Sequence, residues 1–191
     1  LIGQVSLEVP EGTLLPETYN YKFGDTRNSI LVRMQKEMVL FVQKELEKRR
    51  IDLPLKSKED VIILASIIEK EAGLDSEREI IASVFVNRLN KKMKLQSDPT
   101  VRYGVSALVD NKRLTQKDLD RETTHNTYKI DGLPPTPICN PSKASILAAL
   151  SPARTDFFYF VANGLGGHFF SKTLKEHNQN VAKWRKIRNR L

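Results

Sequence analysis

Hydrophobic positions recur with a helical period over the first long segment of the chain. Between about Asp25 and Arg50, apolar residues return every three or four positions, which predicts an amphipathic helix capped by Asp25 or Thr26. Its last part, 44–50, alternates charges and is typical of a solvated helix face. Residues 1–24 contain Pro and Gly that interrupt any such period, so we expect short strands and turns there.

The most apolar stretch of the chain is the unbroken run 61–68. It is too short to span a membrane, which takes about 20 residues, and it predicts a buried helix over about 58–72 that stops at Gly73. A second helical pattern begins at Ser76 with Glu79 three residues on, a capping arrangement. The two helices form a hairpin with strongly apolar faces, and we expect this hairpin to be the core of the fold.

The rest of the chain predicts shorter helices and one hairpin of strands. The expected elements are a helix start with Asp98 as cap and Pro99 at the first position, a helix over 115–119, a helix from Asn140-Pro141 to about Leu150, strands 156–163 and 168–171, and a basic helix from Thr173 to about Arg190. The predicted class is α+β, helix-rich with a small sheet.

Composition excludes only a few classes of function. The 191 residues suffice for one domain with a substantial core, and the net charge of +8 favours an anionic partner. No basic run is interleaved with aromatic residues and no nucleic-acid motif is present, so a nucleic-acid-binding domain is disfavoured. The single Cys139 excludes an internal disulfide, and the scattered histidines lack metal-site spacing, so we expect neither a metal nor another cofactor.

Two carboxylates close the predicted buried helix. Glu69 and Glu71 lie about 200° apart around a helix of 3.6 residues per turn, so they cannot share one role. The negative end of the helix dipole and apolar surroundings both favour a protonated carboxyl group, as a general acid requires. Periodicity leaves open which glutamate faces a cleft, and also whether both are merely solvated charges.

Two polar segments suggest what such an acid would act on. Residues 96–103 and 123–128 are rich in Asn, Gln, Thr and Tyr, side chains suited to the hydroxyl and acetamido groups of sugars. Polar loops are common, so these residues alone indicate only a possible carbohydrate enzyme.

The motifs carry a resemblance that is far more specific. The sequence resembles the YceG-like family, the endolytic murein transglycosylases, through ASIIEKEAG (65–73), SEREIIASVFVNRL (76–89), LQSDPTVRYG (95–104), HNTYKIDGLPPTPICNP (125–141) and FYFVANGLGGHFFSKTLKEHN (158–178). The resemblance implies a lysozyme-like catalytic domain over 11–191, with residues 1–10 as a linker or the tail of an upstream LysM-like region.

The resemblance also implies a reaction. The family cleaves peptidoglycan between N-acetylmuramic acid and N-acetylglucosamine without consuming water, leaving 1,6-anhydro-muramic ends. The catalytic acid of the family falls on Glu71, which would act first as acid and then as base. Ala72 departs from the Ser or Thr that related transglycosylases often place after this residue. The residues expected to line the cleft are Gln96, Asp98, Tyr103, Asn126, Tyr128 and His168.

The family resemblance places the protein outside the cytoplasmic membrane. The chain begins at Leu1 with no initiator Met, signal peptide or transmembrane run, so we expect a single-pass anchor to lie upstream of it. The expected partners are peptidoglycan glycan strands and the cell-wall synthesis machinery. The alternatives are a peptidoglycan hydrolase and a glycan-binding module without chemistry.

Overall fold

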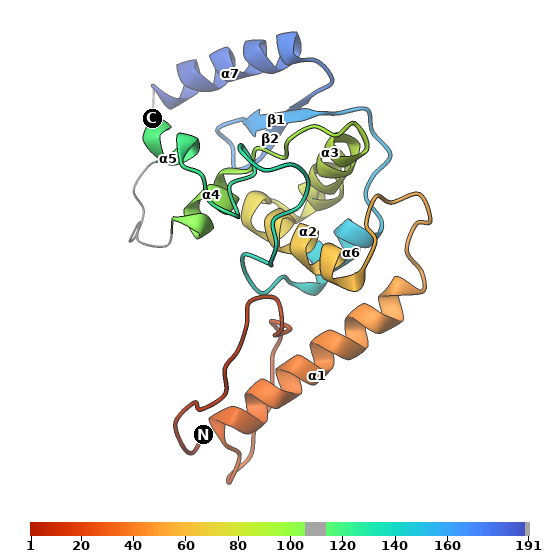
Figure 1. The fold of residues 1–191 in the computed structure, drawn as a ribbon, viewed down its shortest axis with the longest axis vertical. Helices are drawn as coiled ribbons and strands as arrows, with labels where there is room; N and C mark the ends of the chain where they lie inside the picture. The colour runs from red at the N-terminus through yellow and green to blue at the C-terminus, as the bar shows by residue number, and fades with distance from the viewer. Residues whose placement is uncertain (106–113, 190–191) are drawn as a thin grey trace.

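The computed structural model describes residues 1–105 and 114–189 as an α+β fold of helices with a small two-stranded sheet at one side, which confirms the predicted class (Figure 1). The elements are α1 (Arg27–Leu46), α2 (Lys58–Glu71), the 3₁₀ turn η1 (Asp75–Glu77), α3 (Arg78–Asn90), α4 (Asp98–Gly104), α5 (Gln116–Asp120), α6 (Lys143–Leu150), β1 (Tyr159–Ala162), β2 (His168–Ser171) and α7 (Leu174–Arg188). No helix among these described residues is long and apolar enough to cross a membrane.

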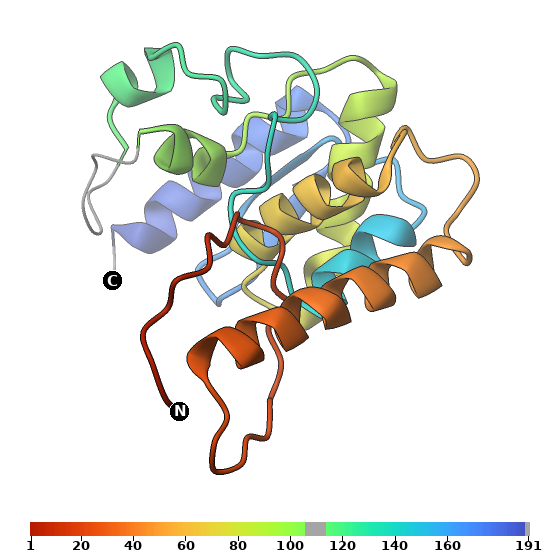
Figure 2. The same ribbon diagram turned by 60° about the horizontal axis from the view of Figure 1, so that its bottom comes forward.

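Helix α2 is the centre of the hydrophobic core. It packs against α1, α3 and α6, and all its residues from Ile63 to Ile68 are buried (Figures 1 and 2). This burial on all sides explains why its apolar run shows no polar face. Each fully buried Leu or Ile contributes about 1.5–3 kcal/mol. The helix is therefore a rigid support for whatever its last turn carries.

The two strands pair antiparallel and lie between α3 and α7. Tyr159 pairs with Ser171 and Ala162 with His168. Helix α7 packs along the hairpin (Figure 1), while the ring of Phe160 meets Phe85 of α3 edge-on at 5.8 Å. The hairpin thus joins the last helix to the core.

Several predicted helix starts are confirmed. Thr26 begins α1 and Thr173 begins α7, each with a reciprocal capping box, and the Ser57 side chain accepts from the backbone N–H of Asp60 at the start of α2. These caps join residues three apart, so the local sequence contains all of the information needed.

Three other predicted starts are wrong. Helix α3 begins at Arg78, not at Ser76, because a 3₁₀ turn precedes it and its N-cap residue makes no side-chain cap. In α4 the N-cap residue is Ser97, and Asp98 is the first helical residue rather than the cap. Helix α6 begins at Lys143, later than predicted, because the Ser142 side chain caps it.

The predicted strands are also revised. Residues 1–24 form no strand, only an isolated bridge between Ile2 and Thr26. The first strand of the hairpin is shorter than 156–163, because Asn87 donates to the backbone carbonyls of Thr155 and Phe157. A side chain of α3 therefore takes the place of a strand partner there.

Candidate active site

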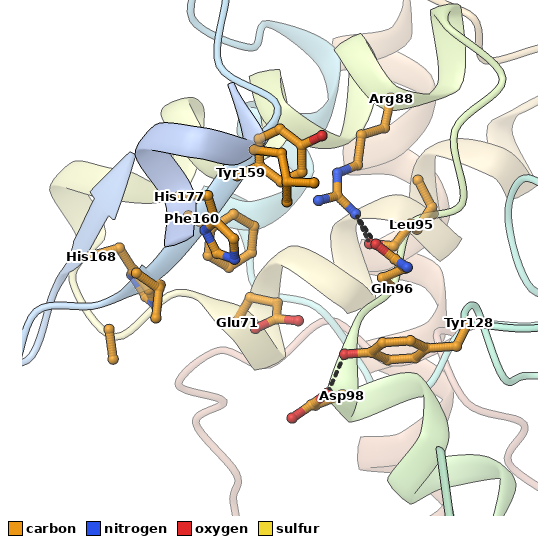
Figure 3. Close-up of a pocket in the computed structure, with 13 residues that line it drawn as sticks. Glu71, Arg88, Leu95, Gln96, Asp98, Tyr128, Tyr159, Phe160, His168 and His177 are labelled. Carbon is orange, nitrogen blue, oxygen red and sulfur yellow. Dashed lines mark hydrogen bonds between the residues drawn. The ribbon is translucent and has the colours of Figure 1, made fainter. Parts of the chain in front are cut away.

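A pocket of about 550 Å³ opens where the end of α2 meets α3, the segment 95–98, the sheet and the start of α7 (Figure 3). Its lining combines carboxyl, guanidinium, phenol and imidazole groups with apolar side chains. It comprises Glu71, Arg88, Leu95, Gln96, Asp98, Tyr128, Tyr159, Phe160, Val161, Ala162, His168, Leu174 and His177.

Glu71 is the last residue of α2 and points into this pocket (Figure 3). Burial raises the pKa of Glu71 to about 7, and the nearby Asp98 carboxylate adds to the rise, while the Ser97 hydroxyl and the Arg88 cation oppose it. Ser97 Oγ donates to Glu71 Oε1 at 2.6 Å. At neutral pH the carboxyl group is therefore poised between its acid and base forms.

Ser97 supplies the hydroxyl partner that Ala72 cannot provide. Its own backbone N–H donates to Thr127 Oγ1 at 2.9 Å, and the residue is buried. The polar segment 123–128 thereby fixes Ser97, which in turn orients Glu71. This contact joins parts of the sequence that local patterns could not connect.

Asp98 and Tyr128 form a pair at one side of the pocket. Tyr128 Oη donates to Asp98 Oδ1 at 2.7 Å, as Figure 3 shows. Burial, with this hydrogen bond to the Asp98 carboxylate, raises the pKa of Tyr128, so its hydroxyl stays a donor. Asp98 is thus a pocket residue and not a helix cap.

Arg88 lies across the pocket from this pair (Figure 3). It is buried on α3, donates through Nη1 to Gln96 Oε1 at 3.2 Å, and lies 5.2 Å from the centre of the Tyr159 ring. Gln96 adopts a left-handed backbone conformation with φ 50°. Arg88 thereby stabilises the unusual turn that carries Gln96 into the pocket.

His168 is held against the end of α2 by Glu77. The Glu77 carboxylate accepts from the His168 backbone N–H at 2.9 Å and contacts its Nδ1 at 2.8 Å. A Cβ on Gly73 would lie 2.5 Å from the carbonyl oxygen of Gly166, so only glycine fits where the hairpin loop meets the α2 end. These contacts place the hairpin wall beside Glu71.

Glu69 points into a separate polar cluster. Its Oε2 accepts from Ser142 Oγ and Ser145 Oγ at 2.6 Å each, and from Arg78 Nη1 at 3.2 Å. Burial would raise the pKa of Glu69, but these hydrogen bonds and the Arg78 charge outweigh burial and lower it. Glu69 is therefore an ionised carboxylate that links α2 to α3 and α6, whereas the Glu71 carboxyl group has a pKa close to neutral pH.

The structure divides the predicted cleft residues into two groups. Gln96, Asp98, Tyr128 and His168 line the pocket with Glu71.

Neither Tyr103 nor Asn126 belongs to the lining of this pocket. The Tyr103 ring packs against His125 at 4.8 Å, and Asn126 is fully buried with its amide group donating to the carbonyls of Leu119 and Arg121. These hydrogen bonds hold the loop 123–128 in place, and they use both N–H groups of the Asn126 amide, which are then not available to a ligand.

Sequence reasoning missed Arg88, Tyr159 and His177, which also line the pocket. The His177 ring stacks on Tyr159 at 5.3 Å, with interplanar angle 26°. Arg88 resembles an ordinary charge near the end of a helix, so the only available signal was its position inside an otherwise apolar segment.

Comparison with known proteins found similar sequences and a similar solved structure. Two endolytic murein transglycosylases are similar: one from Bacillus subtilis, 42% identical over 94% of this chain, and one from Streptococcus pneumoniae, 32% identical over 90%. The chain spans 49% and 32% of their lengths. A crystal structure described as a YceG-like protein from Listeria monocytogenes superposes with TM-score 0.76 and 42% identity, covering 88% of this chain and 54% of that one. The profile of the YceG-like family matches residues 3–183, and the chain belongs to that family.

Proposed function

We propose that this chain is a lytic transglycosylase that cleaves peptidoglycan glycan strands, with Glu71 as the acid–base residue. The observation that carries the proposal is the Glu71 carboxyl group in a pocket, with its pKa raised to about 7 by burial. A residue that must donate and then accept a proton works best with a pKa near the operating pH. The similarity to proteins named endolytic murein transglycosylases supports the choice of substrate.

The proposed reaction uses one carboxyl group twice. Glu71 first donates its proton to the glycosidic oxygen as the bond from that oxygen to muramic C1 breaks. The muramic C6 hydroxyl then attacks C1, and the Glu71 carboxylate removes the hydroxyl proton. The products are a 1,6-anhydro-muramic end and a free 4-hydroxyl, and Glu71 is again protonated without consumption of water.

Ser97 and Arg88 support the second half of this cycle. The Ser97 hydroxyl hydrogen bond and the Arg88 charge both favour the Glu71 carboxylate, the form that must accept a proton from C6. Burial favours the acid form needed first. The balance of these effects allows one residue to serve both steps at one pH.

The test is the nature and amount of product from purified peptidoglycan. Glu71→Gln should keep the fold and lower the rate of anhydro-end formation by about 10²–10⁴-fold, the usual value of a general acid–base group. Glu59→Gln, an exposed residue of the same helix, is the matched control and should leave the rate unchanged. Mass spectrometry of the muropeptides measures both. A Glu71→Gln variant near full activity would refute the assignment.

Asp98 favours one alternative, a hydrolase. Hydrolysing glycosidases generally use two carboxyl groups, and Asp98 is the second carboxylate that lines the pocket. A hydrolase would leave reducing ends, each heavier by one water than an anhydro end. Under our proposal Asp98→Asn retains anhydro products; reducing ends from the unaltered chain would establish the hydrolase instead.

The proposal extends to location and partners. Because the substrate lies outside the cytoplasmic membrane, we expect the chain to act at its extracytoplasmic face, attached through an upstream anchor and close to the cell-wall synthesis machinery. The assignment of residues 1–10 to a linker or to the tail of an upstream region stays a prediction from the sequence. Membrane fractionation of cells expressing the full-length protein tests the location.

A further inference from the structure

Arg88 is a buried cation whose hydrogen bonds go to neutral groups. The residue is 8% exposed. Its Nε donates to the carbonyl of Phe158 at 2.7 Å, and its Nη1 donates to the carbonyls of Lys94 and Leu95 and to the Gln96 amide oxygen at 3.0–3.2 Å. Burial lowers the pKa of Arg88, but a guanidinium group remains charged at neutral pH. None of these four acceptors carries a compensating charge.

The Nη2 end of the same guanidinium is available to the pocket. Within residues 1–105 and 114–189, Nη2 donates no hydrogen bond and Arg88 forms no ion pair, and Figure 3 shows the group directed toward the cavity. The neighbouring wall is formed by Tyr159 and by His177, whose pKa is lowered by burial and by the charge of Arg88. His177 is therefore neutral at pH 7, and Arg88 is the charged member of this wall.

The carboxyl groups in the pocket offset the charge of this wall only in part. Glu71 is shifted toward its acid form by burial, and Asp98 is hydrogen-bonded to Tyr128 on the other side of the pocket (Figure 3). His168, the other titratable group of the lining, is paired with Glu77. An uncompensated buried charge is costly unless an opposite charge meets it, and Arg matches a carboxylate in two-point geometry.

We propose that the wall formed by Arg88, Tyr159 and His177 is a subsite for a carboxylate carried by the muramic residue of the glycan. The inference rests on the proposed function and deepens it. Of the two alternating sugars, muramic acid bears a lactyl carboxyl group, and N-acetylglucosamine bears none. The carboxylate is that of the lactyl group on strands without peptide, or one on the attached peptide. Arg88 thereby sets which sugar occupies each side of Glu71.

Binding to the inactive Glu71→Gln chain tests this directly, because the uncharged glutamine removes Glu71 as a partner for Arg88. Isothermal titration compares three ligands: peptide-free strands with the lactyl carboxylate, the same strands with that group converted to a methylamide, and strands with intact peptides. A charge-assisted hydrogen bond predicts a carboxylate ligand to bind at least about tenfold more tightly than the methylamide. A preference for peptide-free strands or for peptide-bearing strands identifies the source of the carboxylate.

Variants of Arg88 supply the second arm. In the Glu71→Gln background, Arg88→Gln should abolish the preference for a carboxylate, and Arg88→Lys should retain part of it. Arg185→Gln, on the exposed face of α7, makes the same charge change away from the pocket and should keep the preference. If Arg88→Gln does not fold, as judged by thermal denaturation, the three-ligand series decides alone.

The outcomes separate this inference from the function on which it rests. Equal affinity for the methylamide, the peptide-free strands and the peptide-bearing strands overturns the subsite while leaving the transglycosylase proposal intact. Failure to bind any of the three overturns both. A carboxylate preference that persists in Arg88→Gln assigns the carboxylate to another group and likewise overturns the subsite.

Discussion

Replacing Glu71 with glutamine should stabilise the folded chain by an amount that increases with pH. Burial raises the pKa of this carboxyl group from 4.5 to about 7. Between those values the folded chain holds a proton that the unfolded chain has lost, so the stability of the parent falls as pH rises. Glutamine resembles the neutral acid and does not suffer this loss.

The size of the effect follows from the two pKa values. At about 1.36 kcal/mol per pKa unit, the separation of the two pKa values corresponds to a stability difference of about 3 kcal/mol between variant and parent. The full difference applies above the folded-state pKa of about 7, and none of it applies below 4.5. A gain of this size is large against the total stability of a typical domain, about 5–15 kcal/mol. Removing the proposed catalytic residue should therefore improve stability at alkaline pH.

Glu69→Gln provides the matched control, because the same change two residues away should have the opposite sign. Its pKa is lowered, since hydrogen bonds from Ser142 and Ser145 and the Arg78 charge outweigh burial. The Glu69 carboxylate therefore stabilises the fold at pH values above the pKa that Glu69 has in the unfolded chain. This stability is lost as the pH falls through the pKa that Glu69 has in the folded chain. Glu69→Gln should destabilise the chain near neutral pH.

Urea denaturation of the parent and both variants, from about pH 4 to pH 8.5, measures these differences. The free energy of unfolding of Glu71→Gln should exceed that of the parent by an amount that increases between about pH 4.5 and 7. A difference that stays constant with pH, or a Glu71→Gln variant less stable than the parent at high pH, would refute the reasoning.

Three further substitutions test the supports of the site. Ser97→Ala removes a hydrogen bond to the Glu71 carboxylate and should move the basic limb of the pH–rate profile upward by about one unit; an unmoved limb contradicts this role. Gly73→Ala forces a Cβ against the carbonyl of Gly166, so both the activity and the free energy of unfolding should fall. Urea titration should show a loss of about 1–3 kcal/mol. Unchanged values would show that the hairpin loop moves aside to make room for the Cβ. Ser142→Ala removes the α6 cap and a donor to Glu69, and thermal denaturation should show a loss of about 1–2 kcal/mol; no loss would contradict a clamping role.

The elements that local patterns predict well are those stabilised by local contacts. The starts of α1 and α7 rest on capping boxes within four residues, and α2 on its apolar run and its Ser57 cap. The starts of α4 and α6 differ from the predicted ones. The Ser142 side chain caps α6 and also donates to Glu69. Ser97, the N-cap residue of α4, makes no side-chain cap and donates to Glu71 instead.

The same distinction between local signals and tertiary contacts applies to the predicted site residues. The polar residues of segments 96–103 and 123–128 indicated where polar side chains gather, and Gln96, Asp98 and Tyr128 do line the pocket. Asn126 has the same composition signal, but its amide group donates to the backbone carbonyls of Leu119 and Arg121, at the end of α5. Residue type alone cannot distinguish an amide that faces a ligand from one that folds a loop.

The sequence by itself determined the family, the α+β class, the buried central helix and the pair of carboxylates at its end. Those features depend on motif order and on the spacing of apolar residues, which the chain contains locally. Only the tertiary structure decided what each carboxylate does. Two glutamates on one helix meet different partners, Arg78 and the serines of α6 for Glu69, and Ser97 with the pocket for Glu71. Their opposite pKa shifts arise from burial and charge that exist only once the elements pack together.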